Sequence, residues 1–273
     1  MTNLDLGPIG IATGLDSSPA SLEAATVVED LGYPTLWLNG GPLPGLSTVS
    51  DVVRATSSIR VATGILAIVK YDAAGVADLY RSLEAEHPGR LVVGLGGAHG
   101  PNPIRTLNGY LDALDSIPTS RCLLAALGPR MLKLARDRAA GAYPVLITPA
   151  YAEQARAILG ADPVLGVQQL VVLERDASRA REIARRPLSF LLRVPAYAAS
   201  FRRQGFTDDE IDRIDDRLVD AVIAWGDSDA IAARVSELHA AGVDHVALSV
   251  QTGRPDQPLA EWRELATALL PQP

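Results

Sequence analysis

The stretch AALGPRMLKLARDRAAGAYP, residues 125–144, contains the passage from a strand into a helix that decides the fold. It follows the short apolar run of residues 121–125, which predicts a strand, and a Gly-Pro pair at 128–129 breaks that run. Proline suits the first turn of a helix, where a residue without an N–H group is tolerated. The segment therefore predicts a strand, a tight turn and a helix in direct succession.

The N-terminus of this predicted helix offers a place for an anion. The N–H groups of Arg130, Met131 and Leu132 are expected to be free and to point at whatever lies above the strand. The helix dipole and the guanidinium of Arg130 would add positive potential. A phosphate group would fit there, and an ordinary strand-to-helix turn with a solvated arginine is the alternative.

The same alternation of short apolar runs and helical patterns continues along the chain. Helix boundaries are recognisable, as in the segment that Ser18-Pro19 starts and Gly32 stops. Eight such units in 273 residues predict a parallel sheet closed into a (β/α)8 TIM barrel, with a doubly wound open sheet as the second choice. The eight predicted strands are Ile9–Thr13, Thr35–Asn39, Ile59–Ile68, Leu91–Leu95, Arg121–Ala125, Tyr143–Thr148, Gln168–Leu173 and His245–Val250.

One segment is too long for a minimal repeat. Residues 179–224 lie between the seventh and eighth predicted strands and contain two prolines and Gly205. The part from Asp208 to Trp225 has apolar residues on one helical face. We expect a single domain over residues 1–273 with a helical insertion at about 179–226, which either covers the substrate or serves as a packing or dimer element.

Composition excludes several classes of function. With 48% hydrophobic residues the chain can bury a full α/β core, and its net charge of −7 argues against nucleic acid or an anionic membrane as the main partner. The single cysteine, Cys122, allows neither an internal disulfide nor a cysteine-based metal site. We find no basic region followed by an apolar run at the N-terminus and no uninterrupted apolar stretch of about 18 residues, and we expect a cytoplasmic protein.

The string at residues 125–144 closely resembles the A-x-GP-[KR]-M-L-x-L-A-x-x-x-A-[DA]-G segment of coenzyme F420-dependent members of the bacterial luciferase-like superfamily. In that family the backbone of this turn contacts the phosphate-bearing tail of F420. The resemblance therefore implies that Gly128, Pro129, Arg130 and Met131 bind the cofactor. Ala140 stands where the family often has Asp, which is not part of the anion site.

In a barrel, functional residues are expected at the C-terminal ends of the strands. The second predicted strand ends in LWLNGGP, where many relatives carry an Asp-His pair near the flavin or deazaflavin ring. Asn39 could bind a ring carbonyl, but an acid/base role is excluded at Gly40. An asparagine that serves only the turn is the alternative for Asn39.

The resemblance also marks the third strand end. Relatives carry a bulge there with a non-prolyl cis peptide that backs the ring of the cofactor, and Gly64-Ile65 matches that position. Without the resemblance, a plain buried strand that contains glycine would be the prediction. Lys70 lies slightly beyond and could reach a phosphate or carboxylate, although a solvated lysine is the alternative.

The fourth strand ends in RLVVGLGGAHG, where Gly96 and Gly97 allow close backbone approach. Relatives present a glutamate beside the hydride-transfer centre, and His99 occupies the matching place. Histidine titrates near neutral pH and suits general acid/base catalysis. The other histidines are predicted at a helix end, in a helix and at a strand start, so His99 is the candidate catalytic residue, with a loop histidine bonded to backbone as the alternative.

The resemblance implies an oxidoreductase that transfers a hydride between F420 and an unidentified small organic substrate. Two alternatives stay open. One is an FMN-dependent luciferase-like monooxygenase, which would need oxygen and a flavin reductase. The other is a non-catalytic barrel that binds an anionic ligand of the flavin or deazaflavin type. The resemblance is compatible with a homodimer and with an F420 or flavin reductase that supplies reduced cofactor. We expect no metal site, because no cluster of ligand residues occurs at the predicted strand ends.

Overall fold

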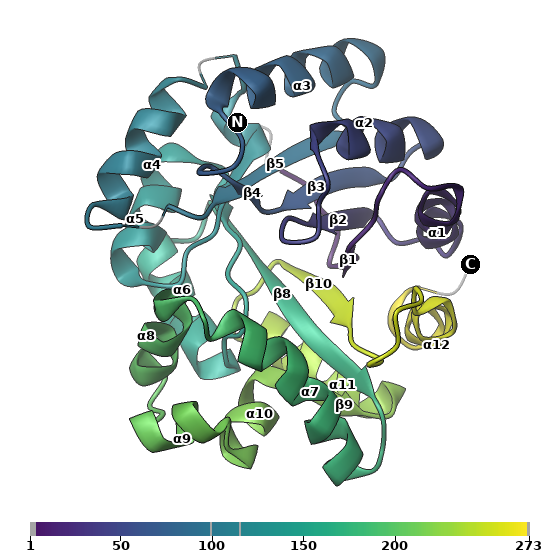
Figure 1. Cartoon of the computed structure of the whole chain (residues 1–273), viewed down its shortest axis with the longest axis vertical. Helices are drawn as coiled ribbons and strands as arrows, with labels where there is room; N and C mark the ends of the chain where they lie inside the picture. Colours follow the sequence, from purple (N-terminus) through teal and green to yellow (C-terminus); the bar gives the residue numbers. More distant parts are fainter. Residues whose placement is uncertain (1–3, 99, 115, 272–273) are drawn as a thin grey trace.

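The computed structural model describes residues 4–98, 100–114 and 116–271. Eight parallel strands form a closed barrel, because the last of them pairs with both the first and the seventh (Figure 1). The predicted (β/α)8 barrel is therefore confirmed, and the open sheet is wrong. The barrel strands are β1 (Ile9–Thr13), β2 (Thr35–Asn39), β3 (Arg60–Gly64), β5 (Leu91–Gly96), β6 (Cys122–Leu124), β7 (Gly141–Ala142), β8 (Val164–Leu173) and β10 (His245–Val250).

Helices connect the strands on the outside of the barrel. Many begin at a side-chain cap. Ser18 accepts a hydrogen bond from the first turn of its helix, as its position in the sequence predicts, and Asp72 does the same at the start of another helix. The helices are α1 (Pro19–Asp30), α2 (Leu46–Ala55), α3 (Ala73–Glu86), α4 (Pro103–Asp112), α5 (Pro129–Arg138), α6 (Pro149–Leu159), α7 (Ala177–Leu191), α8 (Pro195–Arg203), α9 (Asp208–Arg213), α10 (Asp216–Val222), α11 (Ser228–Ala240) and α12 (Leu259–Leu269), with a 3-10 turn at Thr119–Arg121.

Three strand predictions need correction. The seventh predicted strand began at Gln168, whereas β8 begins at Val164. The third predicted strand is split at residue 65 into β3 and β4 (Leu66–Ala67), and β4 pairs with β5. The sixth strand was predicted at Tyr143–Thr148, but β7 lies earlier and covers only Gly141–Ala142. In the predicted segment, Val145 makes only an isolated bridge, to Gln168. The reason is local, because Leu146 adopts a positive φ of 57°, which ends extended pairing.

The insertion is helical for most of its length but ends in a strand. The helix predicted from Asp208 to Trp225 is wrong: Ile214 adopts a left-handed conformation that separates α9 from α10, and Ile223–Gly226 forms β9. β9 pairs in parallel with the C-terminal part of β8. Leu170 and Val171 of β8 pair with both β9 and β10, so β9 and β10 lie on opposite edges of β8. β7 is too short to cover that edge, and the insertion covers it instead.

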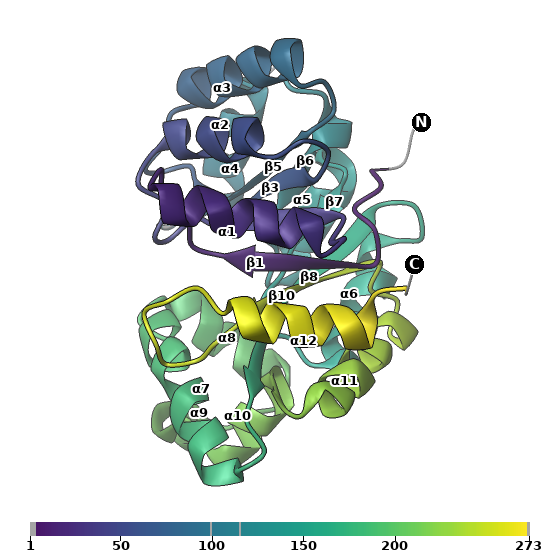
Figure 2. The ribbon, with the colours of Figure 1, turned by 90° about the vertical axis from the view of Figure 1, so that its right-hand side faces the viewer.

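Figure 2 shows how the barrel is oriented. The start of β1 and the end of α12 lie on one side, and the loop after β10 lies with α7 on the opposite side. That opposite side is the C-terminal end of the strands. The insertion therefore stands beside the face where a barrel of this type carries its functional residues.

The inside of the barrel is filled by a small aromatic cluster. Trp37 stacks on Tyr143 with ring centroids 3.7 Å apart and an angle of 2° between the planes. The Trp37 indole N–H donates to Nε2 of His245 over 2.8 Å, so the other ring nitrogen, Nδ1, carries the proton and donates to the Gly7 carbonyl over 2.7 Å. Burial lowers the pKa of His245 to about 4, and the ring is neutral at pH 7.

Candidate functional site

The segment at Gly64-Ile65 forms a bulge at the mouth of the barrel. The peptide bond between the two residues is cis, as the resemblance predicts. The N–H of Gly40 donates to the Gly64 carbonyl over 3.1 Å, and a Cβ on Gly40 would overlap the carbonyl oxygen of Ile65. This contact explains why position 40 holds glycine in this chain: the Ile65 backbone occupies the space in which a side chain would start.

Glycines of the neighbouring strand make room for the Ile65 side chain. A Cβ on Gly96 would lie 3.2 Å from Ile65 Cδ1 and 2.8 Å from the Cβ of Ala125. Gly97 has a φ of 72° and lies against Ala67. The predicted roles of Gly96 and Gly97 as points of close approach are consistent with this packing, although here it is the protein's own backbone and side chains that approach.

The aromatic cluster supports the bulge from below. A Cβ on Gly64 would lie 3.2 Å from Cε1 of Tyr143 and 3.4 Å from Cε3 of Trp37. The Tyr143 hydroxyl is buried, and burial raises its pKa well above the ordinary value. It has no hydrogen-bond partner among the described residues. The stacked rings thus act as a rigid floor under the bulge.

The turn before α5 has fewer free donors than the sequence predicts. Gly128 is the N-cap and Pro129 opens the helix, as expected, but the N–H groups of Met131 and Leu132 both donate to the Gly128 carbonyl. The prediction of three free N–H groups is wrong for these two. Within the described part of the chain, the N–H of Arg130 is left without an acceptor in this turn.

An arginine from the insertion lies beside the same turn. Arg203 of α8 donates from Nη2 to the Leu127 carbonyl over 2.8 Å, and its guanidinium lies 3.5 Å from where a Cβ of Gly128 would be. Tyr151 donates to the same carbonyl over 2.8 Å. Arg203 adds positive charge to that of Arg130. The sequence contains no signal for it, because 75 residues separate it from Gly128 and only the fold brings them together.

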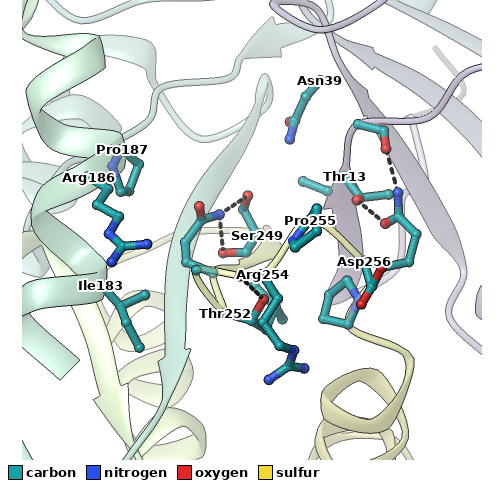
Figure 3. Close-up of a pocket in the computed structure, with 17 residues that line it drawn as sticks. Thr13, Asn39, Ile183, Arg186, Pro187, Ser249, Thr252, Arg254, Pro255 and Asp256 are labelled. Atoms are coloured by element: carbon teal, nitrogen blue, oxygen red, sulfur yellow. Dashed lines mark hydrogen bonds between the residues drawn. The ribbon is translucent and has the colours of Figure 1, made fainter. Parts of the chain in front are cut away.

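Asn39 faces a cavity at the C-terminal ends of β1, β2 and β10. Its Oδ1 accepts a hydrogen bond from Nε2 of Gln168 over 3.1 Å, so its amide NH2 is turned toward the cavity (Figure 3). The cavity has a volume of about 430 Å³. Its walls come from the strand ends, from α7 and from the loop of residues 251–258.

One glutamine fixes this loop to the barrel. Gln257 accepts from the Thr13 hydroxyl over 2.8 Å and donates to the Gly14 carbonyl over 2.8 Å. Thr13, Gln251 and Gln257 were not predicted as site residues. Thr13 is the last residue of β1 and Gln251 directly follows β10, so their places at the ends of predicted strands would have been sufficient to identify both.

The candidate residues are thus partly brought together. Asn39, Gly64, Ile65, Gly96 and Gly97 lie at the ends of neighbouring strands, and the Gly128 turn follows the next strand, β6. The candidate catalytic residue His99 lies outside the described residues. Lys70 donates to the Leu43 carbonyl over 2.7 Å, so it is tied to a neighbouring loop.

The described residues offer neither a metal site nor a membrane-spanning helix. The described residues contain no group of three or more histidine, cysteine or carboxylate side chains that could hold a metal ion. Among the same residues, no helix is long and apolar enough to cross a bilayer. Cys122 is buried, and burial raises the pKa of its thiol to about 12.

Comparison with known sequences gives one short match. No protein-family model matches the chain. A segment of 109 residues is 33% identical to the uncharacterized protein YwcH of Bacillus subtilis (strain 168). The match covers 37% of this chain and only 33% of the relative.

Comparison with solved structures covers nearly the whole chain. An F420-dependent secondary alcohol dehydrogenase in complex with an F420-acetone adduct matches with a TM-score of 0.72 and 15% identity, over 96% of this chain and 98% of the other. The coenzyme F420-dependent tetrahydromethanopterin reductase of Methanopyrus kandleri matches with a TM-score of 0.72 and 17% identity, over 97% and 98%. The oxygenating constituent of 3,6-diketocamphane monooxygenase of Pseudomonas putida, in complex with FMN, has a TM-score of 0.66 and 12% identity, over 97% and 99%.

Proposed function

We propose that the chain is an oxidoreductase that uses coenzyme F420. Its barrel has the luciferase-like fold that it shares with the two F420-dependent enzymes and with the monooxygenase in complex with FMN. The observation that carries the proposal is a convergence of three features on adjoining strands. The Gly64-Ile65 bulge, the Asn39 amide and the Gly128 turn all lie at the C-terminal ends of β2, β3 and β6, with only β5 between the last two.

The residues present fit a cofactor with a polar ring and an anionic tail. The NH2 of Asn39, which has no acceptor in the described part of the chain, can donate to a ring carbonyl. The N–H of Arg130 likewise has no acceptor there, and together with the guanidinium groups of Arg130 and Arg203 it favours a phosphate at the start of α5. We assign Gly128, Pro129 and Met131 to the same tail site, and Gly96 and Gly97 to the wall beside the ring.

When bound, the cofactor would supply hydride transfer at C5 of its ring. The protein would orient the ring against Ile65 and hold it above the Trp37–Tyr143 floor. His99 is our candidate for the proton that accompanies the hydride, because in the sequence it is the third residue after the last residue of β5. The Asn39-Gly40 pair carries no titratable group, so no proton transfer is assigned to it.

FMN is the second candidate cofactor, since a structure with FMN shares the fold. The same turn could hold the phosphate of FMN, and the enzyme would then be a monooxygenase that depends on a reductase. The third candidate is a barrel that binds such a ligand without catalysing a reaction. Its support is that Asn39-Gly40 replaces the Asp-His pair of many relatives.

Binding titrations separate these readings. The purified chain is titrated with F420 and with FMN, and quenching of Trp37, Trp225 and Trp262 fluorescence is followed with correction for the inner-filter effect. We expect selective binding of F420, weakened about tenfold in Arg130→Ala by loss of a charge-assisted contact. Arg136→Ala is the matched control, because Arg136 lies on the same helix and pairs with Asp137.

Selective binding of FMN would move the assignment to the monooxygenase. Binding of neither molecule would overturn both redox readings. If F420 binds, reduction or oxidation of the cofactor in a screen of organic substrates, with His99→Ala as a comparison, tests catalysis. A chain that binds F420 tightly and turns over no substrate would support the non-catalytic reading.

A further inference from the structure

The cavity beside Asn39 is polar, and its charge differs in sign from that of the whole chain. Its lining includes two arginines, Arg186 and Arg254, and one carboxylate, Asp256, whereas the chain carries a net charge of −7. Hydroxyl, amide and charged side chains outnumber the apolar ones in the lining. A ligand for this cavity must therefore be polar.

Most polar groups on the barrel side of the cavity already have partners. Thr13 and Gln257 bond to each other, and Gln257 also donates to backbone. The Gln251 amide donates to the hydroxyl and carbonyl of Ser249 over 3.1 and 3.2 Å. The Asn39 NH2 therefore stands out on this wall as an unused donor, since among the described residues only the oxygen of this amide has a hydrogen-bond partner.

Arg186 provides a second donor on the opposite wall. It comes from α7, and Figure 3 shows its guanidinium pointing into the cavity, whereas that of Arg254 points away. Arg254 is bound to Glu261 over 2.7 Å. Among the residues that the structure describes, Arg186 pairs only with Glu182, at 3.3 Å on the same helix. Both side chains are mostly exposed, and such pairs contribute little to stability.

The loop after β10 lies beside this arginine. Gly253 adopts a φ of 70°, and Arg186 Nη1 lies 3.3 Å from where a Cβ of Gly253 would be. A side chain at position 253 would push the guanidinium away. The guanidinium of Arg186, whose pair with Glu182 is solvent-exposed, thus lies at the outer end of the cavity, and the Asn39 amide lies at the inner end.

We propose that the substrate carries an anionic group, a carboxylate or a phosphate ester, which Arg186 binds at the outer end of this cavity. This inference rests on the proposed function, because it takes the inner end, at Asn39, as the place of the cofactor ring. A substrate that spans the cavity would have its reacting carbon toward the ring and its charge toward α7. A planar guanidinium can bind either anion through two parallel hydrogen bonds.

The test measures binding of small fragments and needs no cofactor. A set of short-chain carboxylic acids, each paired with its primary amide, and of phosphate monoesters, each paired with its alcohol, is screened against the full chain by saturation-transfer NMR. We expect the anionic members to bind about tenfold more tightly than their neutral partners at low salt. Comparison of the carboxylic acids with the phosphate monoesters shows which anion is preferred.

Three variants connect that preference to one residue. Arg186→Gln should abolish it and Arg186→Lys should retain most of it. Arg179→Gln, on the same helix but outside the lining, should leave it unchanged. Equal binding of acids and amides by the unaltered chain would overturn the proposal, and so would a preference that survives Arg186→Gln or disappears equally in Arg179→Gln. Because cofactor titrations are separate, failure of the F420 assignment and failure of this inference can be told apart.

Discussion

The indole N–H of Trp37 donates to Nε2 of His245 across the inside of the barrel, and this bond requires a neutral imidazole. The pKa of His245 falls from 6.5 to about 4 on folding, so below pH 6.5 the unfolded chain binds a proton that the folded chain does not. Stability is therefore fully present above pH 6.5 and is lost as the pH falls toward 4, by about 3 kcal/mol for this group alone. Urea unfolding between pH 4 and 7 measures the slope. His245→Gln should reduce that slope, and an unchanged slope would contradict the assignment.

Gly40→Ala should destabilise the protein by about 2 kcal/mol, because the added methyl group would overlap the Ile65 carbonyl oxygen and the bulge must shift. Gly41→Ala is a close control, since a Cβ there meets nothing within 4 Å. Urea unfolding of both variants gives the difference. Equal stability of the two would mean that the bulge adapts freely to a side chain at position 40.

Tyr143→Phe should be close to neutral, within about 0.5 kcal/mol, because the buried hydroxyl that it removes has no partner among the described residues. Tyr143→Leu should cost about 3 kcal/mol, since it also removes the stack on Trp37. Thermal and urea unfolding can be compared for both. A large loss in Tyr143→Phe would show that the hydroxyl is bonded in solution.

Arg181 connects α7 to the end of the insertion, and Arg181→Ala should destabilise the chain by about 1 kcal/mol. Its guanidinium bonds Asp220 over 2.6 and 2.9 Å and lies 5.6 Å from the ring centroid of Trp225. Arg179→Ala is the comparison, because Arg179 is 72% exposed and should change stability by less than about 0.5 kcal/mol. The change in Trp225 fluorescence on unfolding follows the insertion directly. A larger loss of stability in Arg179→Ala than in Arg181→Ala would refute the prediction.

Much of the barrel could be predicted from the sequence. β1, β2 and β10 have the predicted bounds, because each is a compact apolar run with clear breaks on both sides. β7 was misplaced because only two residues pair, which leaves almost no pattern. β9 was missed because its residues continue the apolar spacing of the helix before them, and only the uncovered edge of β8 makes them a strand.

The site was predictable only where it lies on strand ends. Asn39 ends a predicted strand and Gly96 follows one, so the barrel pattern together with the resemblance identified them. Gly64 lies inside the predicted strand Ile59–Ile68, and the resemblance alone marked it. Arg186 and Arg203 come from helices of the insertion. Their spacing in the sequence carries no information about which strand end they face, so tertiary packing alone assigns them.

The strand β9 has a consequence for how the insertion could be altered. It hydrogen-bonds to β8 from Leu170 to Leu173, where β7 no longer reaches. A variant shortened by residues 179–226 would keep all eight barrel strands but would leave that row of backbone donors and acceptors open to a second molecule. The insertion therefore protects the barrel against self-association through its edge, and a shortened chain should form oligomers that grow with protein concentration in sedimentation experiments.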